Sequence, residues 1–198
     1  MLSKKILSIL AIAFTLVAFF PYLRAIFKAQ VKPHVFSWII WGMTTLIVFF
    51  AELKAKGGVG AWPIGVSASI TLLIAWLAFQ RRGELKMTKL DLAFFVLALS
   101  SLPLWYFTSH PLSAVMVLTL VDLLGFGPTL RKVYVDPYSE SLIFFMLFTI
   151  RNFLVILSLE HYSLTTVLFP AAIGLACLLL LFLTAYRRRY LTLESKKT

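Results

Sequence analysis

Charged side chains inside apolar stretches are the residues of this sequence best suited to do chemistry. Asp122 lies in the apolar stretch 112–131, and Arg151, followed by Asn152, lies in the stretch 140–158. Charges at membrane depth are costly and usually face a cavity or a partner. Three interpretations follow. Asp122 and Arg151 form an ion pair that sets helix packing, or Arg151 binds an anionic or polar substrate, or Asp122 is a proton-coupling site. The sequence does not decide among them.

Seven long apolar stretches must position these residues. Hydrophobic residues make up 61% of the 198 residues, and the mean hydropathy is +0.92, which is more apolar than a soluble domain of this size. Each stretch is close to the roughly 20 residues that cross the hydrocarbon core. We therefore predict an all-α integral membrane protein with seven transmembrane helices. The expected helices cover residues 6–27, 34–53, 61–80, 90–108, 112–131, 140–158 and 164–186.

Basic residues gather at the ends of these stretches and predict the orientation of the chain. The formal net charge is +11, and Lys and Arg number fourteen on one side of the stretches and four on the other. The positive-inside rule then places the N-terminus outside and the C-terminus in the cytoplasm. Basic residues at helix ends favour contact with membrane lipids over a nucleic-acid partner. We expect a multi-pass protein of a bacterial cytoplasmic membrane.

Motifs for catalysis or metal binding are missing from the sequence. It has neither HExxH nor GxSxG, and its three histidines lie at the ends of apolar stretches without metal-site spacing. Cys177 is the only cysteine, so an intrachain disulfide is impossible and we interpret it as a packing residue. The apolar run after Lys4 and Lys5 lacks a small-residue cleavage site, so we expect it to remain as the first helix. The sequence predicts no catalytic residue, no cofactor and no metal.

Residues 19–82 and 126–189 are two copies of one module, with a constant offset of 107. Eleven of the 64 aligned pairs are identical, and prolines and arginines coincide by chance least often in an apolar chain. The telling pairs are Pro21–Pro128, Leu23–Leu130, Arg24–Arg131, Pro63–Pro170, Arg81–Arg188 and Arg82–Arg189. One extra helix between two three-helix copies gives both copies the same orientation. We predict a first repeat at 1–83, a linker helix at 84–110, a second repeat at 111–190 and a cytoplasmic tail at 191–198.

The two copies differ in their polar residues. Asp122, Arg151 and Asn152 are confined to the second copy, and the first copy has small hydroxyl groups at the same positions. The pairs are Asp122 and Thr15, Arg151 and Thr44, and Asn152 and Thr45. A two-fold scaffold with one functionalised half suggests an asymmetric ligand.

Ser67 and a tryptophan pair each allow two interpretations. Ser67 shares a helix face with Thr71, and its small side chain suits either a pocket lining or close helix packing. Trp38 and Trp41 lie one turn apart near a helix start, where they either anchor the helix at the membrane interface or form a stacking platform for a ring-bearing substrate.

Prolines at equivalent positions predict two kinds of local structure. Pro21 and Pro128 lie inside apolar stretches, where proline kinks a helix; each is either a hinge or a static bend. Pro63 and Pro170 are expected in the first turn of a helix, where proline is tolerated.

The segments FFPYLRAIFKAQVKPHVFSW and FGPTLRKVYVDPYSESLIFF resemble the PQ-loop segments of the SWEET, SemiSWEET and PQ-loop transporter family. The resemblance covers nearly the whole chain. It implies three-helix repeats in a 3+1+3 plan, an external N-terminus and kinking prolines in the first helix of each repeat.

The chain departs from that family at the residues expected to bind sugar. Tyr22 and Thr129 follow the prolines where the family has glutamine. The positions of the sugar-binding asparagines hold Ile64 and Ala171, neither of which can hydrogen-bond a hydroxyl group. The aromatic clamp of the family would fall near Phe49 and Ile156, so one side at most is aromatic. The resemblance therefore implies the fold without implying sugar as the substrate.

The leading hypothesis is a transporter of a small polar or anionic metabolite that works by alternating access between two three-helix bundles, with proton coupling at Asp122 left open. The alternative is a non-transporting protein on the same scaffold, such as a sorting receptor, a lipid-binding protein or an assembly factor. One chain holds both repeats and can form the whole path, although the sequence leaves a homo-oligomer open. The expected substrate-binding residues are Arg151, Asn152, Thr44, Thr45, Phe49 and Ser67.

Overall fold

The computed structural model describes residues 2–30, 33–81, 89–138 and 141–194, and all regular structure within them is helical. The helices are α1 (Leu2–Phe27), α2 (Val35–Lys54), the short 3-10 helix η1 (Gly58–Ala61), α3 (Trp62–Gln80), α4 (Lys89–Thr108), α5 (Pro111–Val135), α6 (Leu142–Ser158) and α7 (Leu164–Glu194). Arg82, residues 195–198 of the predicted tail and the side chains of Pro128 and Arg131 lie outside the described part. The predicted all-α class is confirmed.

Capping residues explain where several helices begin. The His34 Nδ1 accepts the backbone N–H of Ser37 at 3.3 Å at the start of α2, and the Ser141 hydroxyl accepts that of Phe144 at 3.3 Å at the start of α6. Both bonds satisfy an amide that a helix start leaves without an intrahelical partner. The two caps, and the two helix starts, differ by the offset of 107 found in the sequence.

The prolines of α3 and α7 lie at different positions within their helices. Pro63 lies in the first turn of α3, as predicted. Pro170 lies inside α7, so the expectation of a first-turn proline there is wrong. The reason is a reciprocal cap one turn earlier: the Ser163 amide donates to the Thr166 hydroxyl at 3.0 Å, and the Thr166 amide donates to the Ser163 hydroxyl at 3.3 Å.

Four helical segments are long and apolar enough to cross a membrane. They are Ser3–Phe27, Val35–Lys54, Gly58–Gln80 and Leu164–Arg189. Three shorter apolar segments accompany them, Leu92–Thr108, Pro111–Gly127 and Leu142–Ser158. Large apolar side chains on the outside of the helices, such as Phe20, Phe79 and Leu179, are more than half exposed. These features are those of a helical membrane protein.

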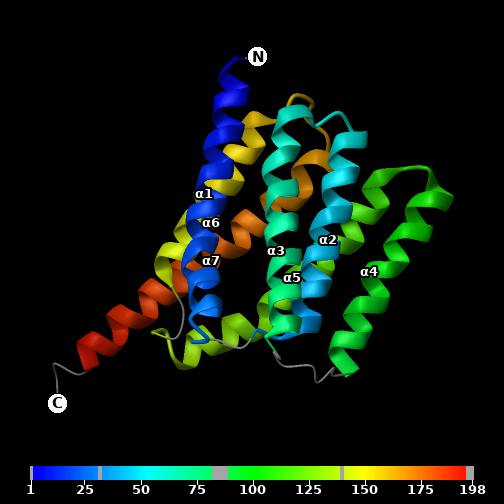
Figure 1. Cartoon of the computed structure of the whole chain (residues 1–198). Helices are drawn as coiled ribbons and strands as arrows, with labels where there is room; N and C mark the ends of the chain where they lie inside the picture. Colours follow the sequence, from blue (N-terminus) through cyan, green and yellow to red (C-terminus); the bar gives the residue numbers. More distant parts are fainter. Residues whose placement is uncertain (1, 31–32, 82–88, 139–140, 195–198) are drawn as a thin grey trace.

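Helices from the two halves of the chain pack across one another (Figure 1). Helix α1 lies against α6 and α3, and α5 lies against α2 and α7, so each first helix contacts the second helix of the other half. Helix α4 lies at the periphery, beside α5 and α2. The N-terminus and the C-terminus lie at opposite ends of the molecule.

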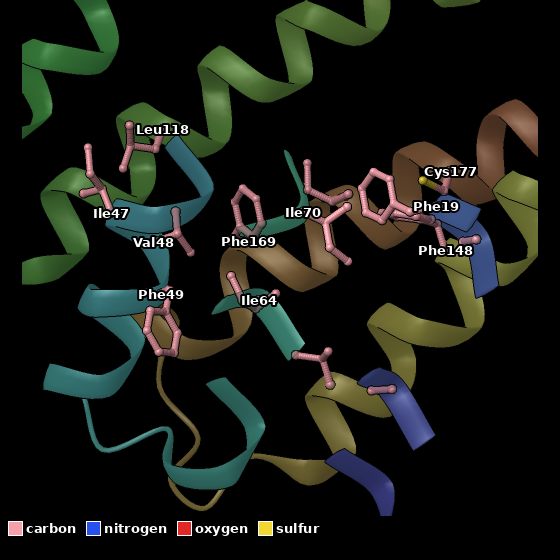
Figure 2. Packing of buried hydrophobic residues seen from close by; sticks show 14 of the residues in the cluster. Phe19, Ile47, Val48, Phe49, Ile64, Ile70, Leu118, Phe148, Phe169 and Cys177 are labelled. Atoms are coloured by element: carbon pink, nitrogen blue, oxygen red, sulfur yellow. The ribbon is translucent and has the colours of Figure 1, made fainter. Parts of the chain in front are cut away.

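The apolar core runs through both halves without a break (Figure 2). Phe19 of α1 meets Phe148 of α6 edge to face, with ring centroids 5.4 Å apart, and Cys177 of α7 lies beside them. Farther along the core, Phe49 of α2 and Ile64 of α3 are buried together. Because lipid tails are as apolar as these side chains, close packing and buried hydrogen bonds must hold the helices together.

Candidate functional site

Arg151 lies at the centre of a buried polar cluster, and its side chain is only 2% exposed. Its guanidinium group donates from Nε to the Thr15 hydroxyl at 3.2 Å, from Nη1 to Asn152 Oδ1 at 2.8 Å and from Nη2 to the Pro63 carbonyl at 2.8 Å. The guanidinium also lies over the ring of Phe148, with its central carbon 5.8 Å from the ring centroid. The Arg151 guanidinium of α6 therefore bonds to both α1 and α3 of the other half.

Asp122 of α5 has a separate partner. Its Oδ1 accepts from the Thr44 hydroxyl of α2 at 2.9 Å, and its side chain is 8% exposed. The Thr44 hydroxyl also lies 3.0 Å from the Trp41 carbonyl, to which it can donate instead. Asp122 and Arg151 thus bond to different residues, and the ion pair considered from the sequence is not formed between them.

These two contacts are equivalent under the sequence offset. Thr15 corresponds to Asp122 and Thr44 corresponds to Arg151, so the pair Thr15–Arg151 becomes the pair Asp122–Thr44 when the halves are exchanged. In each pair a charged residue from the second half meets a threonine from the first half. The two halves are therefore linked by two equivalent pairs, one that contains the cation Arg151 and one that contains the anion Asp122.

Asn152 and Thr45 also behave as equivalent residues. The Asn152 side-chain amide donates to the Phe148 carbonyl at 2.8 Å, and the Thr45 hydroxyl donates to the Trp41 carbonyl at 2.7 Å. Each bond reaches back one turn along its own helix. Asn152 has a second role, since its Oδ1 accepts from Arg151. Arg151, Asn152, Thr44 and Thr45 are all buried in the region where the halves meet.

Phe49 and Ser67 contact other parts of the α2–α3 pair. Phe49 packs on Trp62, with ring centroids 5.5 Å apart, and a Cβ at Gly65 would lie 2.8 Å from the Phe49 ring. Ser67 is buried in α3, and its backbone carbonyl accepts from the Thr71 hydroxyl at 2.8 Å. Neither side chain bonds to Arg151 or Asp122, so the structure does not bring these two predicted residues into the polar cluster.

The predicted hinge positions lie within continuous helices. Helix α1 runs through Pro21, and α5 runs through position 128. Trp38 packs on Tyr22 of α1, with ring centroids 5.0 Å apart, and on Trp41 at 5.5 Å. The tryptophan pair thus joins the start of α2 to the end of α1, close to Pro21.

Glu52 is the buried charge that the sequence analysis missed. Its side chain is fully buried near the end of α2, and neither carboxylate oxygen accepts a hydrogen bond. Arg151 is the charge that acts on it electrostatically, and Glu52 acts on Arg151 in turn. Glu52 lies at the end of the expected helix 34–53, close to Lys54 and Lys56. A usable signal existed, because Glu52 is the only acidic residue in the first 83 and its counterpart in the repeat is Leu159.

The two halves touch directly at the end of the molecule that holds the N-terminus. The backbone N–H of Glu160 donates to the Gly57 carbonyl at 3.0 Å, and Lys4 donates to the Leu159 carbonyl at 2.5 Å. A Cβ at Gly60 would lie 2.7 Å from the Leu159 backbone, so only glycine permits this approach. The loops after α2 and α6 therefore close this end above Arg151 and Glu52.

At the opposite end, arginines bond within their own halves. Arg81 donates from Nη1 to the carbonyls of Ile26 at 3.2 Å and Phe27 at 3.0 Å. Arg187 donates to the Tyr134 carbonyl at 3.0 Å, and its guanidinium lies 4.5 Å from the Tyr134 ring centroid. A cation near the last carbonyls of a helix is favourable because those carbonyls lack intrahelical partners. These bonds tie the third helix of each half to the end of its first helix.

Comparisons with family models, with curated proteins and with solved structures found no match to this chain.

Proposed function

We propose that this protein transports a small polar or anionic metabolite by alternating access between two three-helix bundles. The first bundle is α1, α2 and α3, the second is α5, α6 and α7, and α4 joins them. We further propose that the bundles are parallel repeats of the SWEET and PQ-loop type, that all seven helices span the membrane, and that the N-terminus lies outside. The equal offset of the helix caps and of the cross-bundle contacts supports this reading.

The observation that carries the proposal is the pair of equivalent contacts between the bundles, Thr15–Arg151 and Thr44–Asp122. Both are buried in a region where a membrane offers no water to replace a lost hydrogen bond. Charges are kept in such a place at a cost, and they mark substrate or ion pathways more often than packing sites. A path between the bundles would pass these residues.

The free bonding capacity of Arg151 indicates the chemical class of the substrate. A guanidinium has five N–H donors, and the three hydrogen bonds of Arg151 leave two of them without a protein acceptor. The remaining donors, one on Nη1 and one on Nη2 of a planar cation, suit a carboxylate, a phosphate or another oxygen-rich group. The second carboxylate oxygen of Asp122 accepts no hydrogen bond from a described residue, and a cation and an anion together fit a ligand whose two ends differ.

Transport is tested by reconstitution. The purified protein is placed in proteoliposomes, and uptake and counterflow are measured for a panel of anionic and polar metabolites with and without a pH gradient. We expect saturable flux of at least one solute, loss of flux in Arg151→Gln, and unchanged flux in Ser100→Ala, which alters an exposed hydroxyl on α4. Flux that depends on the pH gradient and disappears in Asp122→Asn would assign proton coupling to Asp122.

One observation favours a non-transporting role as the second candidate. Arg151 already has three acceptors within the protein, which is the arrangement of a residue that holds helices together. The absence of flux for every solute, together with specific binding of a lipid or a protein, would support a receptor or an assembly factor on this scaffold.

A further inference from the structure

Glu52 is the strongest unexplained feature of the buried interior. A carboxylate with no exposed surface and no donor on either oxygen is rare, because each orphaned buried polar group costs free energy that a partner would recover. Thr119 is the other described residue with a buried side-chain oxygen that lacks a partner, but a neutral hydroxyl costs far less than a charge. Glu52 is therefore the described buried group whose charge state most needs a physical explanation.

Among the described residues around Glu52, Arg151 is the one of opposite charge that is placed to interact with it. The helices beside it, α3 and η1, contain no titratable side chain, and α6 contributes only Arg151. Glu160, in the loop after α6, has the same charge as Glu52 and accepts from the Val59 amide of η1 at 3.5 Å. The Cys177 thiol of α7 interacts with Arg151. Lys4 of α1 is bonded to the Leu159 carbonyl, and Asp122 of α5 is bonded to Thr44. Lys54 lies on α2 itself and is exposed.

Arg151 is well placed to respond to Glu52. It is held by the Pro63 carbonyl at the first turn of α3, and it keeps two N–H donors unused. The guanidinium nitrogens of Arg151 and the carboxylate oxygens of Glu52 are more than 4.0 Å apart and form no ion pair. The two groups nevertheless interact electrostatically. Because the guanidinium must shift to reach Glu52, a charged Glu52 competes with the Pro63 carbonyl for the position of the guanidinium, even though two of its donors are unused.

We propose that Glu52 is a proton-binding site that controls the closure of the N-terminal end through Arg151. With a proton on the carboxyl group, Arg151 donates to Pro63 and the loops after α2 and α6 stay together. When the proton leaves to water, the carboxylate accepts from an Arg151 N–H group, the bond to Pro63 breaks, and the first turn of α3 is released. This inference rests on the proposed function, since it assigns the proton step of the same transport cycle to Glu52 in place of Asp122.

Infrared spectroscopy on the purified full-length protein in nanodiscs tests the proton itself. A protonated carboxyl group has a C=O stretching band separate from that of a carboxylate. We expect a Glu52 component of this band in the wild type at mildly acidic pH, its loss at alkaline pH, and its absence at every pH in Glu52→Gln, whereas any component from Asp122 remains in that variant. Asp122→Asn is the matched control and should keep the Glu52 band. A wild-type spectrum identical to that of Glu52→Gln in this region would overturn the proposal.

A labelling experiment tests the coupling to the closed end. Ile64, next to Pro63, is fully buried, so Ile64→Cys in a Cys177→Ala background reports opening through its reaction with a water-soluble maleimide. Rates are divided by those of Tyr162→Cys, an exposed position in the loop after α6, to remove the pH dependence of thiol chemistry. We expect the relative rate to rise with pH, the rise to be lost in Glu52→Gln and to be retained in Glu52→Asp.

The outcomes separate this inference from the proposed function. A rise with pH that persists in Glu52→Gln would overturn the role of Glu52, even if the protein transports solutes. A rise that depends on Glu52 would support that role, because neither measurement uses a substrate. Failure of every solute to cross in the proteoliposome assay would then remove transport alone and leave a pH-controlled membrane protein.

Discussion

The contacts Thr15–Arg151 and Thr44–Asp122 occupy equivalent places and differ in charge. In the first, the Thr15 hydroxyl accepts from the guanidinium and donates to the Ala11 carbonyl at 2.8 Å. In the second, the Thr44 hydroxyl can donate to the carboxylate. A hydroxyl group serves both because it is donor and acceptor at once. In both contacts the first half provides a hydroxyl group that can bond to either charge. The residue of the second half determines whether that charge is positive or negative.

The same substitution at the two threonines should break this comparison most strongly. Thr44→Asp puts a second carboxylate opposite Asp122, and an uncompensated buried charge costs about 3–5 kcal/mol. Thr15→Asp puts a carboxylate opposite Arg151, and a buried ion pair is close to break-even, so we expect a change within about 1 kcal/mol. Denaturant unfolding in detergent at alkaline pH measures both. Thr44→Asn and Thr15→Asn are the neutral controls, and equal destabilisation by both Asp variants would contradict the assignment.

Removing the cation should have the next largest effect. Arg151→Gln loses its charge-assisted hydrogen bonds and its unused donors, and each bond to a charged group contributes about 1.5–3 kcal/mol. We expect transport to fall at least about tenfold, because about 1.4 kcal/mol corresponds to a factor of ten. Initial uptake rates in proteoliposomes check this, with protein content and folding matched by size-exclusion chromatography. Full activity in Arg151→Gln would show that the cation is structural.

Asn152 and Thr45 offer a finer comparison. Both donate to a carbonyl one turn back, but Asn152 also accepts from Arg151. We expect Thr45→Ala to lower the free energy of unfolding by about 1 kcal/mol and Asn152→Ala to lower it by about 2 kcal/mol. The same unfolding assay measures both. If Thr45→Ala costs as much as Asn152→Ala, the bond between Asn152 and Arg151 contributes nothing.

The helix caps should show the smallest difference. His34→Ala and Ser141→Ala each remove the acceptor of one first-turn amide, and loss of a cap costs about 1 kcal/mol. Because the two caps occupy equivalent positions, we expect similar drops in thermal stability, measured by circular dichroism. A drop confined to one of them would mean that the halves are unequal in backbone structure as well as in charge.

The sequence predicted the helices well because their causes are local. Hydropathy and length mark where each helix runs, and the observed ends lie within a few residues of those expected for the second, third, fourth and sixth helices. The largest miss is at the end of α7, which continues to Glu194 although the expected end is residue 186. The start of α1 and the end of α5 each lie four residues beyond the expected limit. Polar residues at a helix end carry no signal that distinguishes a helix that stops at the membrane surface from one that extends past it.

The partners of the polar residues were predicted poorly because their causes are not local. The sequence singled out Asp122 and Arg151, but it could not show that each bonds to a threonine of the other half. It grouped Phe49 and Ser67 with the polar residues as substrate-binding residues. In the structure they contact residues of α2 and α3, and their role in binding stays a prediction. It did not single out Glu52, which lies at the end of the expected helix 34–53 and which the fold buries.

By itself, the sequence determined the all-helical class, the apolar character, the offset of 107 and the restriction of the mid-helix charges to one copy. Only the tertiary structure decided that the first helix of each half lies against the second helix of the other. That crossing brings Thr15 to Arg151 and Thr44 to Asp122, and it seals Glu52 beneath the loops. The physical reason is that helix formation depends on neighbours along the chain, whereas the choice of a partner for a buried charge depends on which helices pack together.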